Sequence, residues 1–321
     1  MSKSERKPYS EADLSKVKTF PMEELSRIVE TDFFAKPMPV GGSLTDFVES
    51  LPKILAAKKL VEFAKIVAEA KRNSKAIIVM YGGHVIKTGL GPLLIDWMKR
   101  GIITAIGTHG AGVIHDTEIA LFGRTSEDVA EGLADGSFGM SRDTADFINK
   151  AISHPDHRDL GYGESLGKQL VDVKAPCHDL SLVYNAYDLQ VPLTVHVALG
   201  TDIIHQHPTA DGEAIGRTSL RDFRILAHEV GKLSEGGVVM NLGSAVIMPE
   251  VFLKALSVAR NLGHDAHKFT TANFDMITHY RPTQNVLTRP TLTGGKKFNF
   301  TGHHEIMIPL LHALVLGELS G

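Results

Sequence analysis

Short runs of apolar residues alternate along the chain with stretches of helical spacing. Residues 76–81 (AIIVMY) and 102–106 (IITAI) are continuous apolar runs, which is typical of strands buried on both faces. Further strands are predicted over residues 193–198, 238–242, 269–274 and 297–300. Helices are predicted over or around residues 90–100, 118–121, 145–152, 180–189, 219–233, 250–261 and 310–316. Because strands joined by helices form parallel sheets, the expected fold class is α/β, with a doubly wound, mostly parallel sheet.

The beginning of the chain differs in character from the rest. The segment 37–42 (PMPVGG) is typical of a linker, and 43–46 (SLTD) is a capping signature that opens a helical region. We therefore predict an N-terminal helical arm over residues 1–42, packed on the body or on another subunit, and a single domain over 43–321. Inside that domain, the glycine- and charge-rich sequence of 123–165 predicts irregular structure apart from its one helix.

Composition and charge exclude several classes of protein. Hydrophobic residues make up 43% and charged residues 22% of the chain, so a globular protein with a sizeable core is expected. The net charge is −3 and basic residues occur at most in pairs, which excludes nucleic acid and an acidic membrane surface as predicted partners. The polar N-terminus and the lack of a long apolar run predict a cytoplasmic protein.

Cysteine and histidine bear on metal and redox chemistry. The single cysteine, Cys177, excludes an internal disulfide and a cysteine-based zinc site. Of the 16 histidines, His205 with His207 and the pair His303-His304 could supply ligands, but no fixed metal-binding spacing joins them. No metal site is predicted.

Ligands of an open parallel sheet bind outside the carboxyl ends of its strands. The candidates after the first two strands are Gly82, Gly83, His84, Thr108, His109 and Gly110. Glycines there let the backbone approach a phosphate, and the N-terminus of the following helix favours an anion. These glycines are equally compatible with tight strand-to-helix turns, since neither GxGxxG nor a P-loop is present. A nucleotide site and a purely structural turn both remain open.

Three later segments also place polar groups beside strands. Asp202 ends the segment 200–202, and Thr271 begins the segment 271–275 (TANFD). Lys296 lies in a glycine turn directly before the last predicted strand. A desolvated lysine has a lowered pKa and becomes a nucleophile for imine formation, whereas the alternative is a solvated lysine on a turn.

Taken together and in order, short motifs over residues 43–318 resemble the deoxyhypusine synthase superfamily. The matching segments are 81–89, 108–116, 166–168, 181–192, 198–202, 271–275, 295–296 and 306–311. The resemblance implies a Rossmann-like fold, a homotetramer and NAD bound at the strand ends. It also implies a transferase that dehydrogenates a polyamine and holds the aminoalkyl group as an imine on a lysine.

The resemblance assigns roles to individual residues. Lys296 aligns with the imine-forming lysine, and His115 and Asp202 complete the expected catalytic set. The expected cofactor-binding residues are Gly82, Gly83, His84, Thr108, His109, Gly110, Asp116, Thr271 and His303. The expected partner is a small-molecule amine or amino acid.

A second resemblance covers residues 82–126. The segment 114–118 (IHDTE) is similar to the LOR/SDH domain of NAD-dependent ornithine cyclodeaminases. An amino-acid deaminase or cyclodeaminase is therefore an alternative, in which Arg281 or Arg289 would hold the substrate carboxylate. The third possible function is that of a non-catalytic relative that kept the fold.

Overall fold

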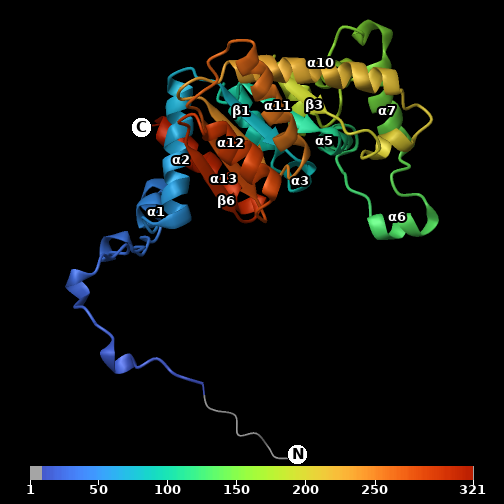
Figure 1. Cartoon of the computed structure of the whole chain (residues 1–321). Helices are drawn as coiled ribbons and strands as arrows, with labels where there is room; N and C mark the ends of the chain where they lie inside the picture. Colours follow the sequence, from blue (N-terminus) through green and yellow to red (C-terminus); the bar gives the residue numbers. More distant parts are fainter. Residues whose placement is uncertain (1–8, 321) are drawn as a thin grey trace, which may run out of the picture.

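The structure, a computed structural model that describes residues 9–320, is built around one open sheet of six parallel strands (Figure 1). The strand order is β3-β2-β1-β4-β5-β6, and every neighbouring pair is parallel. The strands are β1 (Ile77–Tyr81), β2 (Ala105–His109), β3 (Leu193–His196), β4 (Val238–Leu242), β5 (Thr270–Asp275) and β6 (Lys297–Thr301). The predicted α/β class with a doubly wound parallel sheet is confirmed.

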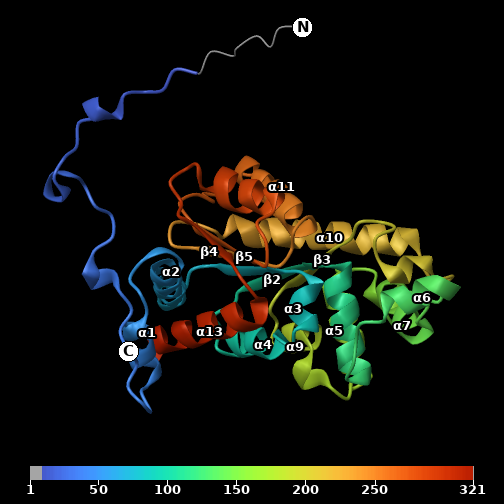
Figure 2. The ribbon, with the colours of Figure 1, turned by 90° about the horizontal axis from the view of Figure 1, so that it is seen from below.

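Helices cover both faces of the sheet (Figure 2). One face carries α10 (Gly212–Gly231), α11 (Ile247–Asn261), the π-helical segment η7 (Pro282–Thr288) and α12 (Arg289–Thr291). The other carries α2 (Leu55–Arg72), α3 (Gly83–Lys87), α4 (Gly91–Lys99), α5 (Gly110–Phe122), α9 (Leu182–Asp188) and α13 (His304–Ser320). Near the β3 edge lie α6 (Val129–Asp135), α7 (Arg142–Ser153) and α8 (Tyr162–Asp172). Two apolar cores result, one on each face of the sheet.

Burial explains which strands the sequence reveals. All five residues of β1 are buried, as are all five of β4, so both strands appear as apolar runs. The second strand was predicted over 102–106, which is wrong by three residues because β2 spans Ala105–His109. Ile102 and Ile103 are buried in the connection before it, and a buried connection has the same apolar character as a buried strand.

The start of α10 also differs from the prediction. The sequence 219–222 has the form of a helix cap, but the helix begins at Gly212 and is capped by Asp211. Ser219 instead donates to the carbonyl of Val195 at 3.0 Å, and Asp222 accepts the amide of Val195 at 2.7 Å. These polar side chains therefore tie α10 to β3, the buried edge strand of the sheet, rather than starting the helix.

Residues 123–165 are more regular than predicted, because they contain α6 and the start of α8 beside the expected α7. The helical region after residue 43 consists of α1 (Leu44–Ser50) and α2. Ser43 caps α1 in a capping box with Asp46, as the sequence predicted.

The N-terminal segment extends away from the rest of the chain (Figures 1 and 2). Residues 9–42 hold no α-helix, so the expectation of a helical arm is corrected to three 3₁₀ turns, η1 (Leu14–Lys16), η2 (Met22–Glu24) and η3 (Thr31–Phe33). Residues 1–8 of the predicted arm lie outside the described residues. Three further 3₁₀ turns, η4 (Pro155–His157), η5 (His178–Leu180) and η6 (Ile203–Gln206), lie in connections. Within 9–320, no helix is long and apolar enough to cross a membrane.

Candidate functional site

The strand order reverses between β1 and β4, which is the point where open α/β sheets bind ligands. Gly82 follows β1, and Gly243 follows β4. A Cβ atom at Gly82 would lie 2.4 Å from the carbonyl oxygen of Gly243, so the two backbones touch and only glycine fits. Gly243 has a φ of +68°, a conformation that also favours glycine. The turns that follow β1 and β4 therefore pack backbone against backbone at this switch point.

The other predicted glycines have packing reasons of their own. A Cβ at Gly83 would lie 3.1 Å from the ring of His115, and one at Gly110 would lie 1.8 Å from Oδ2 of Asp202. The turn interpretation therefore accounts for them without a ligand. Gly110 also begins α5, whose N-cap residue His109 makes no side-chain cap. The positive end of a 13-residue helix thus faces the site without a side-chain cap.

Asp202 lies directly beside this helix N-terminus. Only 7% of the residue is exposed, and its Oδ2 has no hydrogen-bond partner. Burial raises the pKa of Asp202 to about 6, against an opposing hydrogen bond with Thr201. A buried carboxylate oxygen without a partner is costly, so this group is a prime candidate for binding a ligand or proton.

Asp202 and His115 line the same cavity. This cavity has a volume of about 180 Å³ and is bounded by α3, α5 and the loops that follow α5 and β3. Lys87, Glu118 and Glu127 also line it. The structure therefore brings together two of the three residues predicted to be catalytic, in a space smaller than the roughly 300 Å³ of typical ligand pockets.

His115 is held in place from one side. Its Nδ1 lies 2.7 Å from Oγ1 of Thr125, which in turn hydrogen-bonds Glu118. Glu118 also accepts from Thr144 at 3.1 Å. Burial acts to raise the pKa of Glu118, but hydrogen bonds from His115, Thr125 and Thr144 outweigh it and the pKa is lowered. An ionised Glu118 thus anchors the chain of contacts that orients His115.

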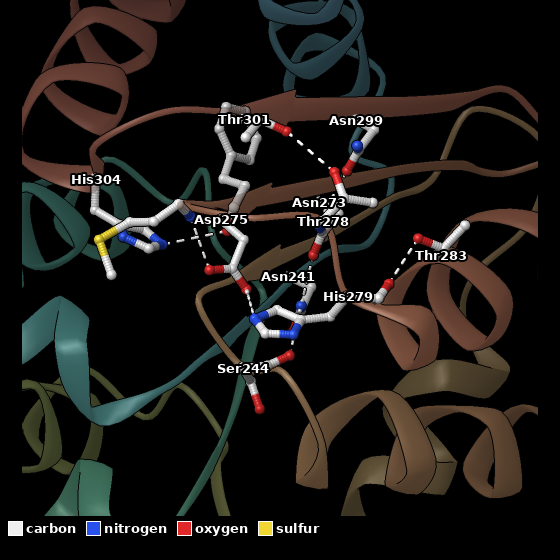
Figure 3. Close-up of polar contacts among 12 residues, drawn as sticks. Asn241, Ser244, Asn273, Asp275, Thr278, His279, Thr283, Asn299, Thr301 and His304 are labelled. Atoms are coloured by element: carbon white, nitrogen blue, oxygen red, sulfur yellow. Dashed lines mark hydrogen bonds and ion pairs between the residues drawn. The ribbon is translucent and has the colours of Figure 1, made fainter.

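A second polar group lies at the carboxyl ends of β4, β5 and β6 (Figure 3). Asn241, Asn273 and Asn299 occupy the same level of the three strands and form a ladder. Nδ2 of Asn241 donates to Oδ1 of Asn273 at 2.8 Å, and Nδ2 of Asn273 donates to Oδ1 of Asn299 at 3.0 Å. Nδ2 of Asn241 also donates to the carbonyl of Ser244 at 2.9 Å. The ladder fixes the loop that follows β4 against the edge of the sheet.

Asp275 and His304 lie just beyond this ladder (Figure 3). Asp275 accepts the amide of Met276 through Oδ1, while its Oδ2 is buried, unpartnered and 3.8 Å from Nε2 of His279. Nε2 of His304 donates to the carbonyl of Phe274 at 3.2 Å, which leaves its buried Nδ1 as an unpartnered acceptor. Both unpartnered atoms are acceptors on the β5 side of the switch point.

Histidines predicted at the strand ends lie at this edge but are mostly enclosed. His109 is in register with His196 of β3, and burial lowers the pKa of His109 to about 4 and that of His196 to about 3. His84 on α3 lies beside His304, with ring centroids 5.4 Å apart. His303 is exposed and pairs with Glu305 at 3.7 Å.

Only two of the twelve predicted site residues line the pocket, and four of the others have clear roles or positions elsewhere. Thr108 is buried and donates to the carbonyl of Tyr81 at 3.0 Å. Thr271 is buried near the amino end of β5. The Asp116 carboxylate accepts three hydrogen bonds at the start of α9, from Ser181 Oγ and two backbone amides, although burial raises its pKa to about 6. Lys296 precedes β6 and so lies at the end of the sheet where the strands begin, whereas the pocket lies at the end where the strands terminate.

The surroundings of Lys296 differ from those of a desolvated lysine. Its side chain is 62% exposed, and its Nζ lies 3.1 Å from Oε1 of Glu62 on α2. The role of Lys296 in imine formation stays a prediction from the resemblance, because its side chain is exposed and ion-paired rather than desolvated.

Sequence reasoning missed several polar groups of this edge. His205 was considered only as a metal ligand, and no group of three or more His, Cys, Asp or Glu side chains in the described part of the chain is arranged for a metal. Asn241, Asp275 and His304 were not singled out as site residues. The available signal was a polar residue near the carboxyl end of an otherwise apolar strand, as with Asn241 in β4.

No protein-family profile and no curated protein sequence matches the chain. A crystal structure from Entamoeba histolytica, assigned as a deoxyhypusine synthase, is 11% identical with a TM-score of 0.55 and covers 88% of this chain and 96% of that one. AgrE in a ternary complex with ornithine and NAD+ is 14% identical with a TM-score of 0.52, covering 83% of this chain. The match spans only 34% of AgrE, about a third of its length.

A LOR/SDH protein from Methanococcus maripaludis S2 is 18% identical over 82% of this chain and 69% of that one, with a TM-score of 0.49. The deoxyhypusine synthase family named from the sequence recurs among the similar structures. At these identities the similarity of the Entamoeba protein and AgrE establishes a shared fold.

Proposed function

We propose that this chain is an NAD-dependent enzyme that oxidises the carbon–nitrogen bond of a small amine or amino acid. The observation that carries the proposal is the buried carboxylate of Asp202, whose Oδ2 has no hydrogen-bond partner and which lines a small cavity beside the switch point of the sheet. Two structures with the same fold support it, since one is assigned as a deoxyhypusine synthase and the other holds ornithine and NAD+.

The residues at the carboxyl edge fit NAD in two respects. The positive end of α5 would offset part of the negative charge that the pyrophosphate brings beside the Asp202 carboxylate. The buried acceptors of Asp275 and His304 would suit donors such as ribose hydroxyls or a carboxamide. When bound, NAD+ supplies a hydride acceptor for the carbon next to the substrate nitrogen.

The cavity itself indicates the substrate. At about 180 Å³ it suits a small molecule. Asp202, Glu118 and Glu127 offer carboxylates to an ammonium group, while Lys87 offers a cation to a carboxylate. Asp202 would hold the ammonium and take the proton that must leave nitrogen before carbon loses its hydride. A carboxyl with a pKa of about 6 is matched to that exchange near neutral pH.

Aminoalkyl transfer through Lys296 would be a further step beyond this oxidation. It requires a lysine that is deprotonated part of the time. The side chain of Lys296 is instead largely exposed and paired with Glu62, not enclosed in an apolar site. We therefore propose the oxidation as the primary activity and treat transfer as the hypothesis to be excluded or revealed by the same experiment.

The experiment combines binding with turnover. Thermal unfolding is followed with NAD+ or NADH, and a site loaded to about a hundred times its Kd adds about 2.7 kcal/mol of stability. NADH formation is then followed with a panel of polyamines and basic amino acids. Asp202→Asn should abolish turnover, whereas Asp211→Asn, an exposed cap of α10, should not.

Trapping with borohydride and mapping the adducts by mass spectrometry tests transfer. An adduct on Lys296, lost in Lys296→Ala and kept in Lys297→Ala, would establish transfer. Cofactor binding with turnover and no modified lysine would establish the oxidation alone. No stabilisation by either cofactor form at millimolar concentration would refute the proposal.

A further inference from the structure

His205 lies opposite the unpartnered oxygen of Asp202. It belongs to the short turn η6, three residues after Asp202, and only 8% of its side chain is exposed. Its Nε2 lies 3.8 Å from Oδ2 of Asp202, and neither atom has a hydrogen-bond partner. Two buried polar atoms thus face each other at slightly more than hydrogen-bonding distance.

The backbone determines which ring nitrogen of His205 carries the proton. The amide of Gly200 donates to Nδ1 of His205 at 3.1 Å. Because an amide N–H cannot accept, Nδ1 must present its lone pair and Nε2 must carry the hydrogen. Protonating Nδ1 would set two N–H groups against each other, and burial also lowers the pKa of His205. His205 is therefore neutral, and its only N–H points at Asp202.

Asp202 is held from the other side by the start of α5. Because Gly110 has no side chain, the Asp202 carboxylate can lie against the first residue of α5. A Cβ atom at Gly110 would lie only 1.8 Å from Oδ2 of Asp202. The carboxylate consequently lies between the positive end of a helix and the N–H of a neutral imidazole. The other ionisable groups around it are His115 and Glu118 of α5, Lys87 of α3 and Glu127, which line the same cavity, and the buried phenol of Tyr162 on α8, which interacts with its charge.

We infer that His205 is a positioning residue that keeps Asp202 ionised and leaves one of its oxygens free for the substrate. A shift of about 1 Å brings Nε2 to a normal distance of roughly 2.8 Å from Oδ2. Oδ1 then receives the substrate proton, which moves from the ammonium nitrogen to the carboxylate. The proton transfer rests on the proposed function, whereas the contact between His205 and Asp202 does not.

The test needs neither cofactor nor substrate. The full-length protein is labelled with ¹³C at the aspartate carboxyl carbons, and the Asp202 signal is assigned by its loss in Asp202→Asn. The pKa of Asp202 is then read from a pH titration. His205→Ala removes a hydrogen bond to a charged group and should raise the pKa of Asp202 by about one unit. His205→Gln, whose amide can donate in the same place, should restore most of that change.

A second measurement uses the unchanged protein. Nitrogen-15 shifts of the His205 ring should report a lone pair on Nδ1 and a proton on Nε2 at neutral pH. A doubly protonated ring, or an equal pKa of Asp202 in the wild type and both variants, would overturn the inference. If His205→Ala fails to fold, the glutamine variant and the ring shifts decide. A positive result without NAD binding would leave the inference standing and refute the proposed function.

Discussion

Replacing Asp202 by asparagine should change how stability depends on pH. Burial raises the pKa of Asp202 from 3.8 in the unfolded chain to about 6 in the folded protein. The folded state therefore binds this proton more tightly than the unfolded state does. The contribution of Asp202 to stability is fully present below about pH 4 and is lost as the pH rises through 6.

The size of the effect follows from the shift in pKa. A change from 3.8 to about 6 is roughly 2 units, and each unit corresponds to about 1.4 kcal/mol. Ionised Asp202 thus costs the folded protein about 3 kcal/mol relative to the protonated form. Asparagine has nearly the same shape and no charge, so Asp202→Asn should be more stable than the wild type at neutral pH by up to this amount. Near pH 4 the two should be equally stable.

Urea unfolding at a series of pH values from 4 to 8 measures this difference. Asp116 and Asp222 also have raised pKa values, but they are present in both proteins and cancel in the comparison. Asp211→Asn is the matched control, because Asp211 is exposed and asparagine can keep its cap. A stability difference that does not vary with pH, or one that grows as the pH falls, would refute the reasoning.

Two further predictions concern residues that the sequence had assigned to the site. Asp116→Ala should destabilise the protein by about 3 kcal/mol in urea unfolding, because it leaves two buried amides at the start of α9 unpaired, and Asp116→Asn should recover part of the loss. An unchanged midpoint would show that Asp116 does not hold α9. Lys296→Ala should cost less than about 1 kcal/mol, since the pair with Glu62 is exposed, and should leave NADH formation unchanged. Loss of turnover in Lys296→Ala would show that Lys296 takes part in the reaction.

Most of the fold could be predicted from the sequence because the central strands are buried on both faces. β4 spans the predicted residues 238–242, and β1 differs from its prediction by a single residue. Errors arose where polar side chains serve tertiary contacts. Ser219 and Asp222 have the local pattern of a helix cap, but they bind the edge of β3. No local pattern distinguishes these two uses of a polar residue.

The candidate site could be predicted only in part. Glycines after strands are visible in the sequence, and the resemblance pointed to Asp202 and His115. The asparagine ladder requires the register of three strands that are distant in sequence, so it becomes evident only in the structure. The contact of His205 with Asp202 spans three residues, yet its meaning depends on the amide of Gly200, which fixes the tautomer.

The position of Lys296 follows from a rule that was already available from the sequence. In a parallel sheet, residues that follow strands gather at one edge and residues that precede strands gather at the other. Asp202 follows β3, whereas Lys296 precedes β6, so the two lie at opposite edges. The five residues of β6, at about 3.3 Å each, separate these edges by roughly 16 Å. A lysine at that distance cannot take a substrate held by Asp202 of the same chain, which is why the proposed oxidation does not depend on it.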